Sequence, residues 1–144
     1  MTDTEIERMA RRTIEDFNRG DWDALRASSA SDSVYEEPAT GRVLHGVDDI
    51  LAALQDWRTG VPDVTGEVHR VVTDGETAVL EILWRGTQTG PLSAGAGTLP
   101  ATGRSFTMWS AMWQTWRDGK LVANRHHQDI LGMLVQLGAV PAPA

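Results

Sequence analysis

His126 is the residue whose type and surroundings best suit proton-transfer chemistry. It lies in a run over residues 120–128 that predicts a β-strand, and alternation along this strand places Val122, Asn124, His126 and Gln128 on one face. An imidazole has an ordinary pKa of about 6.5, so it can take up and return a proton at neutral pH. The alternative interpretation is a histidine that only completes hydrogen bonds within a polar strand.

Two acidic residues are further candidates. Glu37 shares one face of a predicted strand over residues 34–38 with Tyr35. If Glu37 lies in an apolar pocket, its carboxylate has a raised pKa and can act as an acid or a base. The alternative is that Glu37 is an exposed charge on a short edge strand. Asp129 opens a predicted C-terminal helix, where it is either an N-cap or a catalytic carboxylate.

Several other chemistries lack the residues that they require. The 144-residue chain contains no cysteine, which excludes a thiol nucleophile, a disulfide and a cysteine-bound zinc ion. His126 and His127 are neighbours on a strand and point to opposite faces, so one metal ion cannot easily bind both. Gly95-Ala96-Gly97 lacks the third glycine of a dinucleotide-binding loop, and Ser93 lacks the spacing of a nucleophile elbow. We therefore expect neither a metal ion nor a cofactor.

The charge of the chain argues against two classes of partner. It has 13 Lys and Arg residues against 20 Asp and Glu residues, a formal net charge of −7 at pH 7. Nucleic acids and anionic membrane surfaces both require a basic face, so we expect neither. No segment approaches the roughly 18 apolar residues of a membrane span, and the first residues do not resemble a signal peptide. The expected location is the cytoplasm.

Apolar residues at helical spacing predict four helices. The first begins at a capping box formed by Thr4 and Glu7 and ends at Gly20, and a short second helix follows Asp21. The fourth begins at Asp129. The third, which follows Gly46, carries one apolar stripe formed by Val47, Ile50, Leu51, Leu54 and Trp57.

Two Asp-Gly pairs, at residues 74–75 and 118–119, separate runs rich in β-branched and aromatic residues and indicate two hairpins. The four strands are expected over about 64–73, 76–88, 104–117 and 120–128. The third would extend roughly 45 Å if straight, so the sheet must curl, and a curled sheet closed by helices encloses a cavity. The segment over residues 90–103 is expected to be a loop, either a flexible connector or a flap at the mouth of the pocket. This order of elements predicts an α+β fold rather than a doubly wound one.

The long strand over residues 104–117 has two different faces. Trp109 and Trp113 lie on one of them, and Ser110, Met112 and Gln114 lie on the other with Met108 and Trp116. If Met112 faces the pocket, Ser110 and Gln114 supply polar groups there. The two tryptophans then cover the outer face as core or as a dimer surface. A β-bulge in this strand would reverse the alternation for the residues that follow the bulge.

Several segments together resemble one protein family. They are Phe17–Trp22 (FNRGDW), His45–Ile50 (HGVDDI), Trp84–Gly90 (WRGTQTG), Leu99–Arg104 (LPATGR), Trp116–Leu121 (WRDGKL) and Asp129–Gly138 (DILGMLVQLG). They resemble the SnoaL-like polyketide cyclases of the nuclear transport factor two-like superfamily, in the right order and over nearly the whole chain. The resemblance implies one domain over residues 1–144. It also implies a cone in which a bent, mainly antiparallel mixed sheet wraps on N-terminal helices around one deep apolar pocket, and homodimers formed through the outer sheet face.

The resemblance also suggests site residues. The family pattern His-x-Asp-x-x-Asp places its first aspartate, the acid/base of characterised cyclases, at His126 and its second at Asp129. A family histidine on the preceding strand falls on Met112, the central histidine of Gly-Thr-His-Thr-Gly falls on Gln88, and a polar pocket residue falls on Glu37.

Two functions follow as hypotheses. The first is a cofactor-independent enzyme that acts on an apolar cyclic or polyketide-like small molecule by cyclisation, isomerisation, dehydration or hydrolysis. In it His126 moves the proton and Glu37, Tyr35 or Gln88 stabilises the developing oxyanion. The second is a non-catalytic protein that binds a small molecule in the same pocket. The expected catalytic residues are His126, Glu37 and Asp129, and the expected substrate-binding residues are Tyr35, Trp57, Gln88, Ser110, Met112, Gln114 and Asn124.

Overall fold

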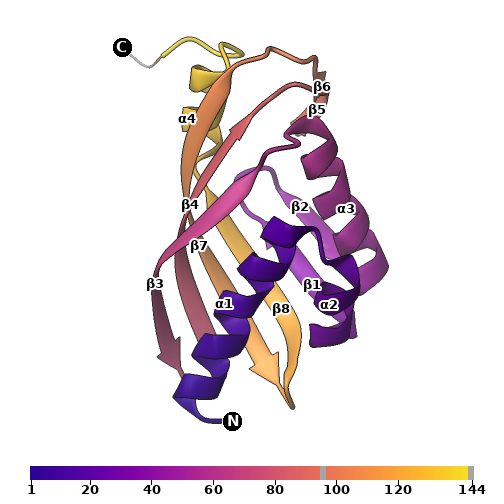
Figure 1. Cartoon of the computed structure of the whole chain (residues 1–144), viewed down its shortest axis with the longest axis vertical. Coiled ribbons are helices and arrows are strands. Elements are labelled where there is room, and N and C mark those ends of the chain that lie inside the picture. The colour runs from indigo at the N-terminus through magenta and orange to yellow at the C-terminus, as the bar shows by residue number, and fades with distance from the viewer. Residues whose placement is uncertain (95–96, 143–144) are drawn as a thin grey trace.

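Four helices form on the predicted stripes. A computed structural model describes residues 1–94 and 97–142. The helices are α1 (Asp3–Arg19), α2 (Trp22–Ser28), α3 (Val47–Gly60) and α4 (Ile130–Gln136), and the first three lie together on one side of a curved sheet (Figure 1).

The two predicted hairpins are confirmed. The first joins β3 (Thr65–Asp74) to β4 (Thr77–Thr87), and the second joins β7 (Ser105–Arg117) to β8 (Lys120–Gln128). Gly75 and Gly119 have φ angles of 59° and 76° in the two turns, a backbone region that favours glycine.

The sheet is mixed and has six strands in the order β2-β1-β8-β7-β4-β3. Strand β1 (Ser29–Glu37) forms an antiparallel pair with β2 (Arg42–His45) and a parallel pair with β8. The α+β class and the mainly antiparallel mixed sheet are therefore as predicted. The parallel contact brings the N-terminal β1 beside the C-terminal β8, which places Tyr35 next to Asn124 in register.

The inner face of the sheet meets the helices, and the outer face does not. Along β7 the buried side chains are those of Phe106, Met108, Ser110, Met112, Gln114 and Trp116. Trp109 and Trp113 alternate with them and are 49% and 48% exposed. Met112 therefore faces the interior with its polar neighbours, as expected.

A bulge corrects one part of the predicted alternation on β8. The register between β7 and β8 shifts between Thr115 and Trp116. Because two residues then oppose one, the pattern slips by one position at this end of the strand. Leu121 lies in the core in the place where Val122 was expected, whereas His126 stays on the inner face.

The segment predicted as a loop over residues 90–103 contains a small hairpin. It consists of β5 (Leu92–Ala94) and β6 (Gly97–Leu99), and the two residues between them, 95 and 96, lie outside the described residues, as does most of the Gly95-Ala96-Gly97 run. Leu92 is buried in the core, which anchors the hairpin against the body of the protein.

Side-chain caps begin three of the helices. Asp21 and Asp129 cap α2 and α4 as predicted. The capping box of α1 is formed by Thr2 and Glu5 and not by Thr4 and Glu7, because both pairs have the required spacing and the helix begins two residues earlier.

Trp84 packs where α1, α3 and the sheet meet. Its ring lies edge-on to Phe17 and to Trp57, with centroid distances of 5.5 and 5.0 Å. Gly66 on the edge strand β3 leaves room for this ring, since a Cβ there would lie 2.6 Å from the nearest Trp84 carbon. The Asn18 amide holds the Gly66 backbone, accepting from its N–H (2.8 Å) and donating to its carbonyl (2.9 Å).

Replacing Gly66 with alanine is therefore expected to lower the free energy of unfolding by about 1–3 kcal/mol, the usual cost of overpacking a core. The added methyl group displaces the Trp84 indole, so the near-ultraviolet circular dichroism of tryptophan should change as well. Urea denaturation measures the effect. The exposed Arg70→Ala on the same strand is the control, and equal stability of the two variants would contradict this packing.

Candidate functional site

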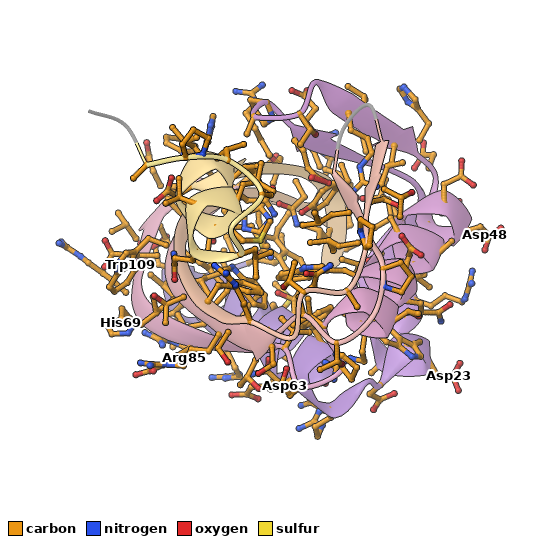
Figure 2. The ribbon with its side chains drawn as sticks, turned by 90° about the horizontal axis from the view of Figure 1, so that it is seen from above. Asp23, Asp48, Asp63, His69, Arg85 and Trp109 are labelled. Carbon is orange, nitrogen blue, oxygen red and sulfur yellow. The ribbon has the colours of Figure 1, made fainter. Side chains whose placement is uncertain are left out.

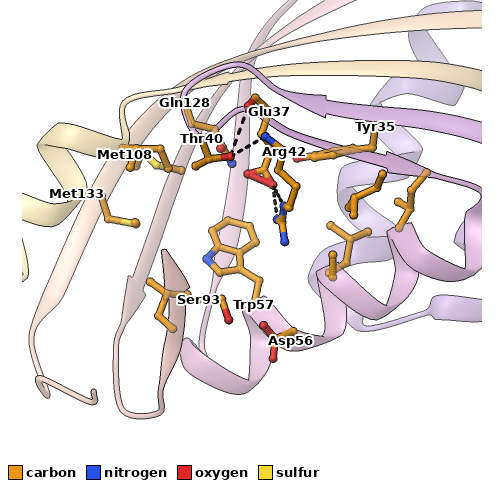
Figure 3. A pocket seen from close by; sticks show the side chains of 16 residues that line it. Tyr35, Glu37, Thr40, Arg42, Asp56, Trp57, Ser93, Met108, Gln128 and Met133 are labelled. Atoms are coloured by element: carbon orange, nitrogen blue, oxygen red, sulfur yellow. Dashed lines mark hydrogen bonds and ion pairs between the residues drawn. The ribbon is translucent and has the colours of Figure 1, made fainter. Parts of the chain in front are cut away.

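Two adjoining cavities, each of about 70 Å³, lie between the inner face of the sheet and the helices. The sequence predicted one pocket. The outer cavity opens beside β2 and the β5–β6 hairpin, and Figure 3 shows Glu37, Arg42 and Trp57 around it. The inner cavity lies deeper, over Met112, Gln114, Asn124 and His126. Tyr35, Ile50, Leu54 and Trp57 line both cavities, so these side chains separate two parts of one hollow.

Glu37 lies at the outer cavity and is only 6% exposed, so the alternative of a surface charge is wrong. Arg42 Nε donates to Glu37 Oε1 at 2.9 Å, and Arg42 Nη2 donates to the same oxygen. Both of these bonds fall on Oε1, which leaves Oε2 without a bond to Arg42. Arg42 was not among the residues predicted for the site, although its place just beyond the strand predicted over residues 34–38 was a usable signal.

His126 belongs to a chain of buried hydrogen bonds. Tyr35 Oη lies 2.7 Å from His126 Nδ1, and Ser110 Oγ lies 2.8 Å from His126 Nε2. Trp84 Nε1–H donates to the same Ser110 oxygen at 2.8 Å. His126 and Tyr35 line the inner cavity, whereas Ser110 lines neither cavity and supports the imidazole from behind.

Burial determines the protonation states of these groups. It lowers the pKa of His126 from 6.5 to about 3, with a smaller contribution from repulsion by His127, so the ring is neutral at pH 7. Burial and the nearby Glu37 carboxylate raise the pKa of the Tyr35 hydroxyl far above its usual value. The site therefore presents a neutral imidazole and a protonated phenol.

The inner cavity has mostly apolar walls and two amide side chains. Gln114 is fully engaged, since its Nε2 donates to Thr13 Oγ1 (3.0 Å) and its Oε1 accepts from Trp116 Nε1–H (3.1 Å). Asn124 differs, because its Oδ1 is buried and has no hydrogen-bond partner among the described residues. The same holds for Gln128 Oε1, beside the outer cavity.

Two predicted site residues have structural roles. Gln88 is fully buried but lines neither cavity; its amide accepts from the Thr102 N–H and hydroxyl and donates to the carbonyls of Gly90, Leu99 and Pro100. It cannot bind an oxyanion because its hydrogen-bonding groups are occupied in holding this segment. Asp129 is exposed, lies outside both cavities and accepts from Gly132 N–H at the start of α4 (3.0 Å).

Neither a metal cluster nor a membrane helix is found in residues 1–94 and 97–142. No three His, Cys, Asp or Glu side chains of these residues gather in a way that could hold a metal ion. None of the helices there combines the length and the apolar character needed to cross a bilayer.

The comparisons with known proteins agree on one family. A family model for the SnoaL-like polyketide cyclases matches residues 7–137 of this chain. None of the curated proteins matches it significantly.

Solved structures supply further relatives. IdmH from Streptomyces antibioticus, a candidate polyketide cyclase, is 29% identical, with a TM-score of 0.79 over 92% of this chain and 98% of that one. TsrD from Streptomyces laurentii is 25% identical, with a TM-score of 0.83 over 97% and 99%. A candidate SnoaL-like polyketide cyclase from Jannaschia sp. CCS1 has a TM-score of 0.85 over 96% and 94%, and at 20% identity this likeness concerns the fold alone.

The buried neutral His126 predicts a pH-dependent stability. The folded-state pKa of about 3 lies below the ordinary value of 6.5, so the unfolded chain binds the proton first as the pH falls. The contribution of His126 is complete above about pH 6.5 and is lost between that value and pH 3, at up to about 1.4 kcal/mol per pH unit.

Urea denaturation between pH 4.5 and 7.5 tests this expectation. His126→Gln removes the titrating group, and the difference in unfolding free energy between pH 7.5 and 4.5 should become smaller in this variant. His45→Gln, at an exposed position on β2, should behave as the wild type does. An unchanged pH dependence in His126→Gln would show that the ring is not held neutral.

Proposed function

Since the chain belongs to the SnoaL-like polyketide cyclase family and has its NTF2-like fold, we propose that it is a cofactor-independent acid/base enzyme. Its substrate is an apolar, carbonyl-bearing cyclic or polyketide-like small molecule. The assignment of IdmH as a candidate polyketide cyclase supports this substrate class. The observation that carries the proposal is the Tyr35 side chain, which lines both cavities and has its hydroxyl bonded to His126.

The Tyr35 hydroxyl is suited to stabilise an enolate oxygen. It remains protonated because burial raises its pKa, and the Tyr35 side chain that carries it lines both cavities. A fixed O–H dipole in an apolar cavity interacts strongly with charge that develops on a carbonyl oxygen, since little water competes for it. In this proposal Tyr35 donates a hydrogen bond to the substrate carbonyl.

Glu37 is the proposed base. Its carboxylate lies on the same face of β1 as Tyr35, at the outer cavity, and Arg42 holds Oε1 while Oε2 can accept a proton. The C–H bond next to the carbonyl breaks, its proton moves to Glu37, and its electron pair forms the C=C bond of an enolate. Addition of the enolate carbon to a second carbonyl then closes a ring, and the proton returns to the new alkoxide.

His126 is assigned a positioning role in place of the proton-abstracting role expected from the sequence. A pKa of about 3 makes the imidazole a weak base, and both ring nitrogens have partners. If Ser110 donates its proton to Nε2, the ring proton resides on Nδ1 and is donated to Tyr35 Oη. The Tyr35 proton then points into the cavity.

Gln128 supports this tautomer. Its Nε2 lies 3.2 Å from His126 Nδ1 while its Oε1 has no partner among the described residues. Rotation of the terminal amide by half a turn exchanges the two atoms, so that Oε1 becomes a second acceptor, sharing Nδ1–H with Tyr35 Oη. The opposite tautomer would direct both Tyr35 O–H and a Gln128 N–H at one lone pair.

Exchange of α-hydrogens tests the proposed chemistry without the natural substrate. The wild-type protein should accelerate the exchange of 2-tetralone α-hydrogens for deuterium in heavy water, followed by proton NMR. Tyr35→Phe should reduce the acceleration about 10²- to 10³-fold through loss of the oxyanion donor, and Glu37→Gln should abolish it. Asp129→Asn keeps a helix cap and should retain the wild-type rate.

A non-catalytic binding protein is the second candidate, and the low basicity of His126 favours it. In that case tryptophan fluorescence would report 2-tetralone binding while exchange proceeded at the rate of the buffer alone. Exchange that Tyr35→Phe and Glu37→Gln leave intact would instead reject the assigned residues.

We also propose that two copies pair through the outer sheet face. Trp113, Val79 and Val72 are consecutive neighbours across β7, β4 and β3, and Figure 2 places Trp109 on the same side as His69 and Arg85, away from α3. Two ion pairs lie near the apolar strip formed by Trp113, Val79 and Val72. One joins Arg125 to Glu36, and the other joins Arg85 to Glu67. Mixed charge around an apolar centre suits a two-fold contact, in which the same surface meets itself.

Sedimentation equilibrium tests the dimer. The wild type is expected to sediment as a dimer, and Trp113→Arg should weaken association at least tenfold by burying an unpaired charge. Ala52→Arg, at an exposed position of α3 on the other side of the sheet, is the control and should remain dimeric. A monomeric wild type would reject the proposed pairing.

A further inference from the structure

The Asn124 side chain carries an unsatisfied polar atom on the wall of the inner cavity. Its Oδ1 is buried and has no hydrogen-bond partner among residues 1–94 and 97–142. The strand register places Asn124 between Tyr35 on β1 and Gln114 on β7, on the face that lines the inner cavity.

The neighbouring polar groups do not share this condition. Gln114 has partners at both ends of its amide, and His126 has partners at both ring nitrogens. Gln128 Oε1 also lacks a partner among the described residues, but Gln128 lines the outer cavity and not the inner one. Of the buried side-chain atoms that lack a partner among residues 1–94 and 97–142, Asn124 Oδ1 is thus the one that lies on the inner cavity.

An unpartnered buried carbonyl destabilises the folded state relative to an apolar side chain of similar shape. Leucine would fill a similar volume and match the surrounding walls, which include Phe17, Leu51 and Leu121. The amide therefore does not serve folding through any contact seen in the structure. A ligand that brings a hydrogen-bond donor would satisfy it.

We infer that Asn124 is a specificity-determining residue that accepts a hydrogen bond from a ring hydroxyl of the ligand in the inner cavity. It selects hydroxylated ring compounds over those with hydrogen or a methoxy group at the same position. The inference rests on the proposed function in one respect, which is that it takes this ligand to be the substrate. The hydrogen bond to Asn124 does not depend on any reaction taking place.

The position of Asn124 defines a two-point arrangement. Asn124 lies two residues along β8 from His126, roughly 6.6 Å at the usual rise per residue of a strand. A ligand whose carbonyl meets the Tyr35 hydroxyl can therefore direct a hydroxyl on its far ring toward Asn124. The apolar walls would hold the rings between the two points, and a bicyclic ketone of this form carries both groups.

Binding of three matched ketones tests the inference. The affinities of 6-hydroxy-2-tetralone, 6-methoxy-2-tetralone and 2-tetralone are measured by titration calorimetry and by tryptophan fluorescence. Wild-type protein should bind the hydroxy compound about five- to tenfold more tightly than the other two, the gain expected of one neutral hydrogen bond. Asn124→Leu should lose this preference and bind 2-tetralone at least as well as the wild type does.

Two control variants complete the measurement. Arg125→Gln, next to Asn124 but on the opposite face of β8, should keep the preference. Urea denaturation should show Asn124→Leu to be at least as stable as the wild type, whereas Gln114→Leu, which breaks two satisfied hydrogen bonds, should be less stable. A marked loss of stability in Asn124→Leu would mean that the amide serves folding, and the inference would fail.

The outcomes separate this inference from the proposed function. Equal affinity of the three compounds for the wild type, or no measurable affinity for any of them, overturns the role of Asn124 even if deuterium exchange depends on Tyr35 and Glu37. A preference for the hydroxy compound that disappears in Asn124→Leu supports that role even if the wild type catalyses no exchange.

Discussion

The hydrogen-bond chain from Trp84 through Ser110 and His126 to Tyr35 connects the core of this protein to its cavity. Buried polar groups are stable only when partnered, so each member of such a chain restricts the orientation of the next. Trp84 is itself held by the packing of α1 and α3 against the sheet. The orientation of the Tyr35 hydroxyl at the cavity thus depends on a ring that lies in the core.

Low polarity around this chain gives the site its chemical character. Because charge is costly in such surroundings, the imidazole stays neutral and the phenol keeps its proton. The carboxylate of Glu37 keeps a partner in Arg42, whose side chain reaches the cavity from the adjacent edge strand. A proton donor and a proton acceptor on one face of β1 suit carbonyl chemistry on the proposed apolar, polyketide-like substrate.

Local patterns were sufficient to predict most elements. Asp-Gly turns identify the two long hairpins, helical spacing of apolar residues identifies the helices, and alternation groups Met112 with Ser110 and Gln114 on one face of their strand. The predictions that failed concern features that nearby residues do not determine. At the first helix, two capping pairs with the same spacing compete. The bulge near Leu121 depends on how β7 pairs with β8, and the short β5–β6 hairpin is anchored by Leu92 in a core whose other residues are remote in sequence.

The α+β order, the family and the type of groups available for chemistry follow from the sequence, because they depend on residue identity and on spacing along the chain. Which of those groups meet depends on how the chain folds. Gln88 and Asp129 looked like site residues until their bonds to Thr102 and Gly132 were visible, whereas Arg42 became part of the site by pairing across a hairpin. Hydrogen bonding and desolvation act through space, so the state of a buried side chain follows from neighbours that are remote in sequence.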